Sequence, residues 1–125
     1  MSKHLLFAGF VLMALVAVRG KIWAGDPTGV AWEAIREGAL LIDTRTHGEF
    51  KAGHLDGAVN IPYEQTDALV ALIGEDKGRA VVVYCRTGRR SGIALDALLA
   101  RGYTNVVNGG GFTALREARA NPARP

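Results

Sequence analysis

The chain has a single cysteine, Cys85, and the residues after it form the basic run Arg86-Thr87-Gly88-Arg89-Arg90. Adjacent guanidinium groups and the positive end of a following helix favour thiolate over thiol, and they lower a cysteine pKa from about 8.5 to about 3.5–7.5. The thiolate is the nucleophilic form of the residue. We therefore predict that Cys85 is a nucleophile beside a concentrated anion site. The alternative is a buried, unreactive cysteine next to a solvated basic turn.

The segments around Cys85 predict where this loop lies in the fold. Residues 80–84 are continuously apolar and rich in valine, which is typical of a central parallel strand buried on both faces. A helical pattern begins at Ser91 and runs to Gly102. A loop between the carboxyl end of a buried strand and the start of a helix is where open α/β sheets bind ligands. Cys85 is therefore expected at the ligand-binding edge of a sheet.

The remainder of the chain alternates short apolar runs with amphipathic stretches, and glycines separate them. This pattern predicts βαβ units, a parallel sheet and the α/β fold class. Strands are predicted over residues 39–42, 58–61, 80–84 and 105–107. Other helices are predicted from a Thr28 cap to Gly38, around Glu49-Phe50, from a Thr66 cap to Gly74, and from Phe112 to Ala118. Gly109-Gly110-Gly111 is predicted to be a turn, since no Gly-Lys-Ser/Thr follows it.

Residues 1–24 have the pattern of a secretory signal peptide. Lys3 and His4 precede an unbroken apolar run over residues 5–18, which matches the basic and apolar regions of such signals. Cleavage after Ala24 would release a periplasmic domain of residues 25–120 with a flexible tail of residues 121–125. Ile22 is large for its place near that cleavage site, so the alternative is an uncleaved tether to the inner membrane over residues 5–24.

The charge and the metal-ligating residues exclude several function classes. The net charge is +3, but Lys3, Arg19 and Lys21 lie in the N-terminal segment, which leaves 12 basic residues against 12 acidic ones. We therefore expect no nucleic-acid binding, and membrane contact only through the N-terminal segment. One cysteine and three histidines form no cluster at ligand spacing, so no metal and no cofactor are expected.

Several separate blocks of the sequence occur in one characteristic order. They are Leu41-Ile42-Asp43-Thr44-Arg45 with Glu49-Phe50, the run from Gly53 to Pro62, the run from Val83 to Ser91, Gly102-Tyr103, and Asn108-Gly109-Gly110-Gly111. In this combination the chain resembles the rhodanese family, in its short single-domain bacterial form. The resemblance implies a three-layer α/β fold, with a small, mostly parallel sheet flanked by helices on both faces.

The resemblance also implies an activity, that of a thiosulfate sulfurtransferase. Cys85 would take a sulfane sulfur from a small anionic donor as a persulfide, and would pass it to cyanide or a thiol. Tandem-domain rhodaneses carry a thiosulfate-binding arginine where this chain has Glu49, so donor binding is expected to depend on the loop itself. The protein is expected to be a monomer.

Individual roles follow from the same resemblance. The residues expected to cradle the sulfur with backbone N–H groups, or to attract the donor with side chains, are Arg86, Thr87, Gly88, Arg89 and Arg90. The residues expected to support this loop are Asp43, Arg45 and Ser91.

Two alternatives to a sulfurtransferase stay open. A cysteine-dependent phosphatase or arsenate reductase has a similar strand-loop-helix site, with an arginine after five intervening residues. Here Ser91 holds that position and Arg90 comes one residue earlier, so the loop is tighter than a tetrahedral oxyanion requires. The second alternative is a non-catalytic sulfur carrier or binding module.

Overall fold

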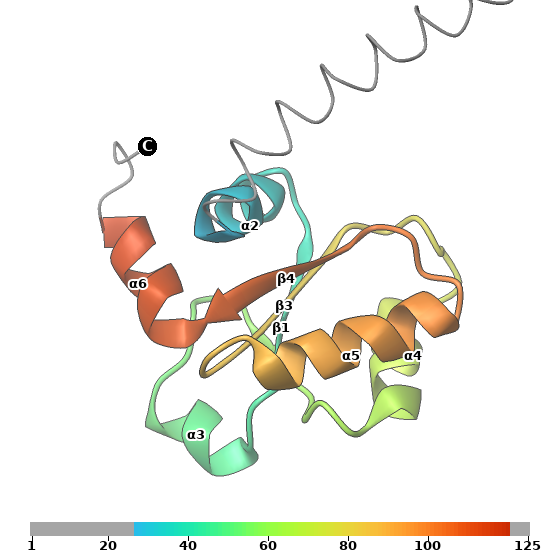
Figure 1. Ribbon diagram of the computed structural model, residues 1–125, viewed down its shortest axis with the longest axis horizontal. Helices are drawn as coiled ribbons and strands as arrows, with labels where there is room; N and C mark the ends of the chain where they lie inside the picture. The colour runs from blue at the N-terminus through green and yellow to red at the C-terminus, as the bar shows by residue number, and fades with distance from the viewer. Residues whose placement is uncertain (1–26, 121–125) are drawn as a thin grey trace, which may run out of the picture.

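The computed structural model describes residues 27–120, and both the predicted signal peptide and the predicted tail lie outside these residues. The elements, in chain order, are α2 (Pro27–Arg36), β1 (Leu40–Asp43), α3 (His47–Ala52), β2 (Val59–Asn60), α4 (Thr66–Ile73), β3 (Val81–Cys85), α5 (Arg89–Ala100), β4 (Val106–Gly111) and α6 (Phe112–Ala120). The four strands form a parallel sheet in the order β2-β1-β3-β4 (Figure 1). Within the described residues, no helix has the length and apolar character to cross a membrane.

Helices cover both faces of this sheet, as the α/β prediction required. Helices α4 and α5 pack on one face through residues such as Leu69 and Leu98, and α2 and α6 pack on the other through Trp32 and Leu115 (Figure 1). Strand β3 lies between β1 and β4, and all five of its residues are buried. A strand covered on both faces has to be apolar throughout, which explains its sequence. The predicted three-layer architecture is confirmed.

The predicted helix caps at Thr28 and Thr66 are wrong. Helix α2 already includes Pro27, so Thr28 lies inside its first turn. Proline suits that turn because its φ angle is fixed near the helical value and its missing N–H would have no helical partner. Helix α4 begins at Thr66 itself, after Gln65, whose side chain makes no capping hydrogen bond. A threonine cap occurs instead at Thr46, before α3, where Glu49 completes a capping box.

Strand β4 is longer than predicted, and the glycine triplet belongs to it. Val83 is paired with Asn108 and Tyr84 with Gly110, so the register shifts by one residue at this point and Cys85 is paired with Gly111. The predicted turn at this triplet is therefore wrong, although glycine is uncommon in strands. Here the missing side chains permit close approach, because a Cβ on Gly111 would lie 2.5 Å from the carbonyl oxygen of Arg86.

This contact predicts opposite effects for two Gly→Ala substitutions. Gly111→Ala should destabilise the domain by about 1–3 kcal/mol, because the added methyl group forces the backbone after Cys85 to move. Gly48→Ala is the matched control, because Gly48 lies in α3 with open space around it. Alanine at this position should stabilise the domain by about 0.4–1 kcal/mol. Urea unfolding measures both changes. A Gly111→Ala protein as stable as the parent would contradict the close approach.

Candidate active site

Cys85 is the last residue of β3, and only Arg86, Thr87 and Gly88 separate it from the first residue of α5. The turn depends on Gly88, which has a φ of 96° and precedes the helix. A Cβ at this position would also lie 3.2 Å from the Cα of Gly110 in β4. The helix begins two residues earlier than predicted, so Arg89 and Arg90 lie in its first turn. The loop is therefore short and is pressed against β4.

Hydrogen-bond donors surround the sulfur of Cys85. The N–H of Gly88 donates to Sγ over 3.0 Å, and the hydroxyl of Ser91 lies 3.4 Å from it. Burial by itself raises the pKa of the thiol, but hydrogen bonds from the Ser91 hydroxyl and from the N–H groups of Ser91, Thr87 and Gly88 outweigh burial. The pKa of Cys85 is therefore below its ordinary value, as the sequence predicted. These donors stabilise the thiolate, which is the nucleophilic form.

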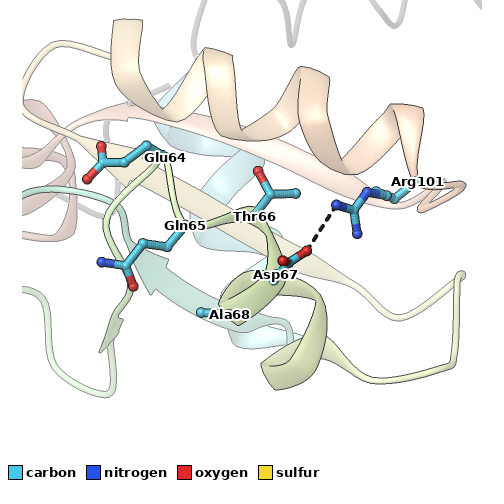
Figure 2. Close-up of a pocket in the computed structure, with 6 residues that line it drawn as sticks. All are labelled: Glu64, Gln65, Thr66, Asp67, Ala68 and Arg101. Carbon is cyan, nitrogen blue, oxygen red and sulfur yellow. Dashed lines mark hydrogen bonds and ion pairs between the residues drawn. The ribbon is translucent and has the colours of Figure 1, made fainter.

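The side chain of Cys85 is fully buried, with 0% of its surface exposed. A donor molecule therefore reaches the sulfur only when neighbouring side chains move. A surface hollow of about 440 Å³ lies elsewhere, at the start of α4 (Figure 2). Residues 64–68 and Arg101 line it, and Arg101 pairs with Asp67 over 3.0 Å. None of these residues belongs to the Cys85 loop. Among the described residues, no three histidine, cysteine, aspartate or glutamate side chains are grouped as metal ligands.

Asn108 is a site residue that the sequence analysis missed. Its side-chain nitrogen donates to the carbonyl of Gly88 over 2.9 Å, while its oxygen accepts from the hydroxyl of Ser91 over 2.8 Å and from the N–H of Gly110 over 3.0 Å. Asn108 therefore joins β4 to the end of the loop and to the first turn of α5. The available signal was a polar residue in a short apolar strand, directly before three glycines.

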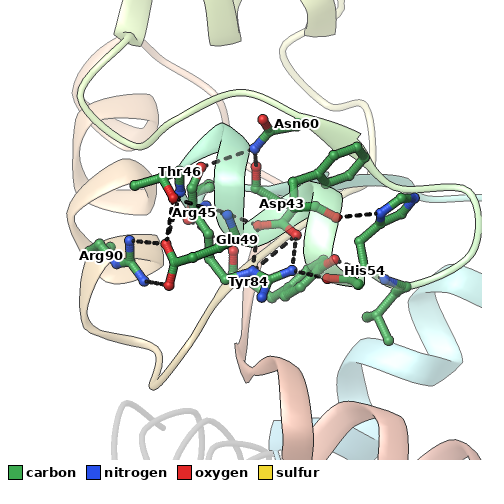
Figure 3. A network of polar contacts seen from close by, with 12 residues as sticks. Asp43, Arg45, Thr46, Glu49, His54, Asn60, Tyr84 and Arg90 are labelled. Carbon is green, nitrogen blue, oxygen red and sulfur yellow. Dashed lines mark hydrogen bonds and ion pairs between the residues drawn. The ribbon is translucent and has the colours of Figure 1, made fainter.

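Arg90 points to α3 and forms a two-pronged ion pair with Glu49 (Figure 3). Its Nη1 and Nη2 atoms lie 2.8 and 3.0 Å from the two carboxylate oxygens. These hydrogen bonds are the main reason why the pKa of Glu49 falls to about 2; burial opposes them, and bonds from Thr46 add to them. The side chains of Arg86 and Arg89 are exposed and have no ion-pair partner within residues 27–120. The structure thus separates three arginines that the sequence analysis treated alike.

Asp43 and Arg45 form a buried ion pair at the end of β1, with Arg45 Nη2 2.6 Å from Asp43 Oδ2 (Figure 3). The same nitrogen donates to the carbonyl of Gly53 over 2.7 Å, and the guanidinium lies 4.5 Å from the centre of the Phe112 ring. The pair therefore connects β1, the turn after α3 and the start of α6.

The link from this pair to the loop is indirect. Thr44, between the two charged residues, donates to the carbonyl of Tyr84 through its N–H over 2.8 Å and through its hydroxyl over 2.9 Å. Tyr84 immediately precedes Cys85. Of the three residues predicted to support the loop, only Ser91 lies next to the sulfur. Asp43 and Arg45 are linked to the end of β3 through Thr44.

Ser91 gives a test of how the thiolate is stabilised. The one hydroxyl proton of Ser91 is shared between Asn108 Oδ1, at 2.8 Å, and Cys85 Sγ, at 3.4 Å. Ser91→Ala removes this donor and should raise the pKa of Cys85, so the thiolate is lost at a higher pH. A hydrogen bond to a charged group contributes about 1.5–3 kcal/mol, so the pH profile of alkylation by iodoacetamide should move to higher pH by about one unit or more. The measurement is the alkylation rate as a function of pH, with Thr104→Ala, an exposed hydroxyl remote from the sulfur, as the control. An unchanged pH profile would show that Ser91 does not act on the sulfur.

Known proteins of Escherichia coli are similar to this chain in sequence and in fold. Thiosulfate sulfurtransferase PspE of Escherichia coli is 41% identical over 71 residues, which cover 57% of this chain and 68% of that protein. A solved structure described as a rhodanese with anions from E. coli superposes with a TM-score of 0.57 at 38% identity, covering 62% of this chain and 91% of that one. The matches therefore cover more than two thirds of each of these two proteins.

A tRNA uridine(34) hydroxylase of Buchnera aphidicola is also similar, at 34% identity over 87 residues. The match covers 65% of this chain and only 28% of that protein. The likeness to this larger enzyme is therefore confined to one part of it. The sequence model of the family described as a rhodanese-like domain matches residues 28–118 of this chain. This range includes all four strands and the whole Cys85 loop. The chain therefore belongs to the rhodanese-like domain family.

Proposed function

We propose that this member of the rhodanese-like domain family moves a sulfane sulfur from a donor such as thiosulfate to cyanide or a thiol, with a Cys85 persulfide as the intermediate. The observation that carries the proposal is the ring of donors at the sulfur, formed by the N–H groups of Thr87, Gly88 and Ser91 and by the Ser91 hydroxyl. Such a ring stabilises a negatively charged sulfur atom. The E. coli relative named a thiosulfate sulfurtransferase supports the same reaction.

The first half of the cycle loads the cysteine. The Cys85 thiolate attacks the outer sulfur of thiosulfate, the S–S bond of thiosulfate breaks, and sulfite leaves with the electron pair. The new terminal sulfur of the persulfide carries the negative charge, which the N–H groups of the loop can bind. The exposed guanidinium groups of Arg86 and Arg89 attract the anionic donor.

The second half unloads the cysteine. The carbon of cyanide, or the sulfur of a thiol, attacks the terminal sulfur of the persulfide, and the Cys85 thiolate leaves with the electron pair. In the first half the Cys85 thiolate attacks, so no proton has to be removed in that step. In the second half Cys85 is the leaving group: cyanide attacks as the anion, and a thiol attacks as its thiolate after losing its proton to solvent. The lowered pKa of Cys85 agrees with both roles.

Cys85→Ser is the direct test of this cycle. The hydroxyl cannot carry a persulfide, so thiocyanate formation from thiosulfate and cyanide should fall to background. Mass spectrometry of the parent after thiosulfate treatment should show one added sulfur atom on Cys85. An active Cys85→Ser protein would overturn the mechanism, and a stable persulfide without turnover would favour the sulfur-carrier alternative.

The phosphatase alternative is disfavoured by two features of the site. Three residues between β3 and α5 leave a tight loop, and both Nη atoms of Arg90 are bound by the carboxylate of Glu49. A tetrahedral phosphoryl group would require a wider ring of donors and an arginine that faces it.

We therefore expect no hydrolysis of p-nitrophenyl phosphate, measured as release of p-nitrophenol in the pH range in which thiocyanate is formed. The Cys85→Ser protein serves as the blank for contaminating phosphatases. Hydrolysis that is robust in the parent and absent from Cys85→Ser would instead assign the loop to phosphoryl transfer.

A further inference from the structure

The ion pair between Glu49 and Arg90 joins α3 to the start of the helix that follows the Cys85 loop. Arg90 lies in the first turn of α5, and its pKa is raised mainly by its hydrogen bonds to Glu49 and further by the nearby Cys85. Its positive charge therefore acts on the sulfur, while the carboxylate of Glu49 neutralises much of it for an approaching anion. The remaining loop arginines, Arg86 and Arg89, are exposed to solvent, which screens their charge.

Glu49 is held in this position by a second set of contacts. Its Oε1 atom accepts from the N–H of Thr46 over 3.0 Å and from the hydroxyl of Thr46 over 3.1 Å, in addition to Nη1 of Arg90. The N–H of Glu49 in turn donates to the Thr46 hydroxyl over 3.2 Å. With a pKa of about 2, the carboxylate is ionised at every pH at which the protein would be assayed. The neutralising charge is thus both fixed and permanent.

We propose that Glu49 is a specificity-determining residue: by pairing with Arg90 it disfavours dianionic donors such as thiosulfate relative to sulfane-sulfur donors that carry one negative charge. The inference rests on the proposed function and narrows its substrate class. When the carboxylate charge of Glu49 is removed, the positive charge of Arg90 is no longer neutralised and can attract the second negative charge of a dianion. A monoanionic donor loses less from the neutralisation, because Coulomb attraction scales with the charge of the donor.

The capping box of α3 indicates a substitution of Glu49 that removes the charge without removing the cap. Glutamine satisfies the same position of a capping box as glutamate, so Glu49→Gln removes the charge and preserves the start of α3. Asp67→Asn is the matched control, because it removes one negative charge from an exposed aspartate–arginine pair at the far end of α5. Eleven helical steps of about 1.5 Å place Arg101 roughly 16 Å from Arg90.

The experiment compares two donors with cyanide as the acceptor. Thiosulfate is the dianion, and benzenethiosulfonate is a monoanion whose outer sulfur the Cys85 thiolate attacks in the same way, with benzenesulfinate leaving as the S–S bond breaks. In Glu49→Gln, kcat/KM for thiosulfate relative to benzenethiosulfonate should rise about tenfold, as expected for one restored charge near the reacting atom. Asp67→Asn should leave the ratio at the parent value. An unchanged ratio in Glu49→Gln overturns the inference.

A second measurement does not depend on turnover. Sulfate and methanesulfonate, a dianion and a monoanion, are tested as protectants of Cys85 against iodoacetamide. Glu49→Gln should be protected at about tenfold lower sulfate than the parent, with little change for methanesulfonate. In the parent alone, the two anions should protect at similar concentrations, and a strong preference of the parent for sulfate overturns the inference even if the variant does not fold. Absence of sulfur transfer from both donors, with the predicted protection intact, would count against the proposed function only.

Discussion

The contact of the Cys85 loop with β4 is the constraint on which the site depends. Gly88 lies against Gly110, and the carbonyl of Arg86 lies where Gly111 would have a side chain. Backbones can approach this closely only where both sides lack a Cβ or point it away. The loop is thereby forced into a turn whose N–H groups converge on the sulfur. Asn108 stabilises the turn, because its side chain donates to the carbonyl of Gly88 and accepts from the hydroxyl of Ser91.

Two charged pairs act on this loop from different directions, and they do different things. Asp43 and Arg45 are buried and connect the end of β1 to the segments around it, so they fix the frame on which Tyr84 and Cys85 lie. Glu49 and Arg90 are partly exposed and join α3 to the first turn of α5, and in the proposal above they set the charge next to the loop. Removal of one partner of a buried pair leaves an uncompensated charge in the interior, whereas a partly exposed charge can be solvated.

The sequence predicted those parts of the fold that follow from local pattern. The continuous apolar run before Cys85 identified the central strand, and Gly38 and Gly74 marked the ends of two helices. The lone cysteine in a basic loop predicted where the candidate site lies. The glycine triplet was misjudged, because its strand conformation follows from pairing with β3 and from a register shift that no local pattern encodes. The Glu49–Arg90 and Asn108–Ser91 contacts also join segments remote in sequence, so residue type alone could not reveal them.

Glu49 illustrates how one residue can restrict the routes open to evolution. Its carboxylate completes the capping box of α3 and also balances Arg90, so a substitution there alters both helix stability and the charge of the site. Glutamine is the change that separates these two effects, since it retains the cap and loses the charge. A lineage that adapts to a more highly charged donor can therefore replace Glu49 by glutamine without weakening α3. Direct replacement of Glu49 by a small apolar residue would remove the charge and weaken the helix in one substitution.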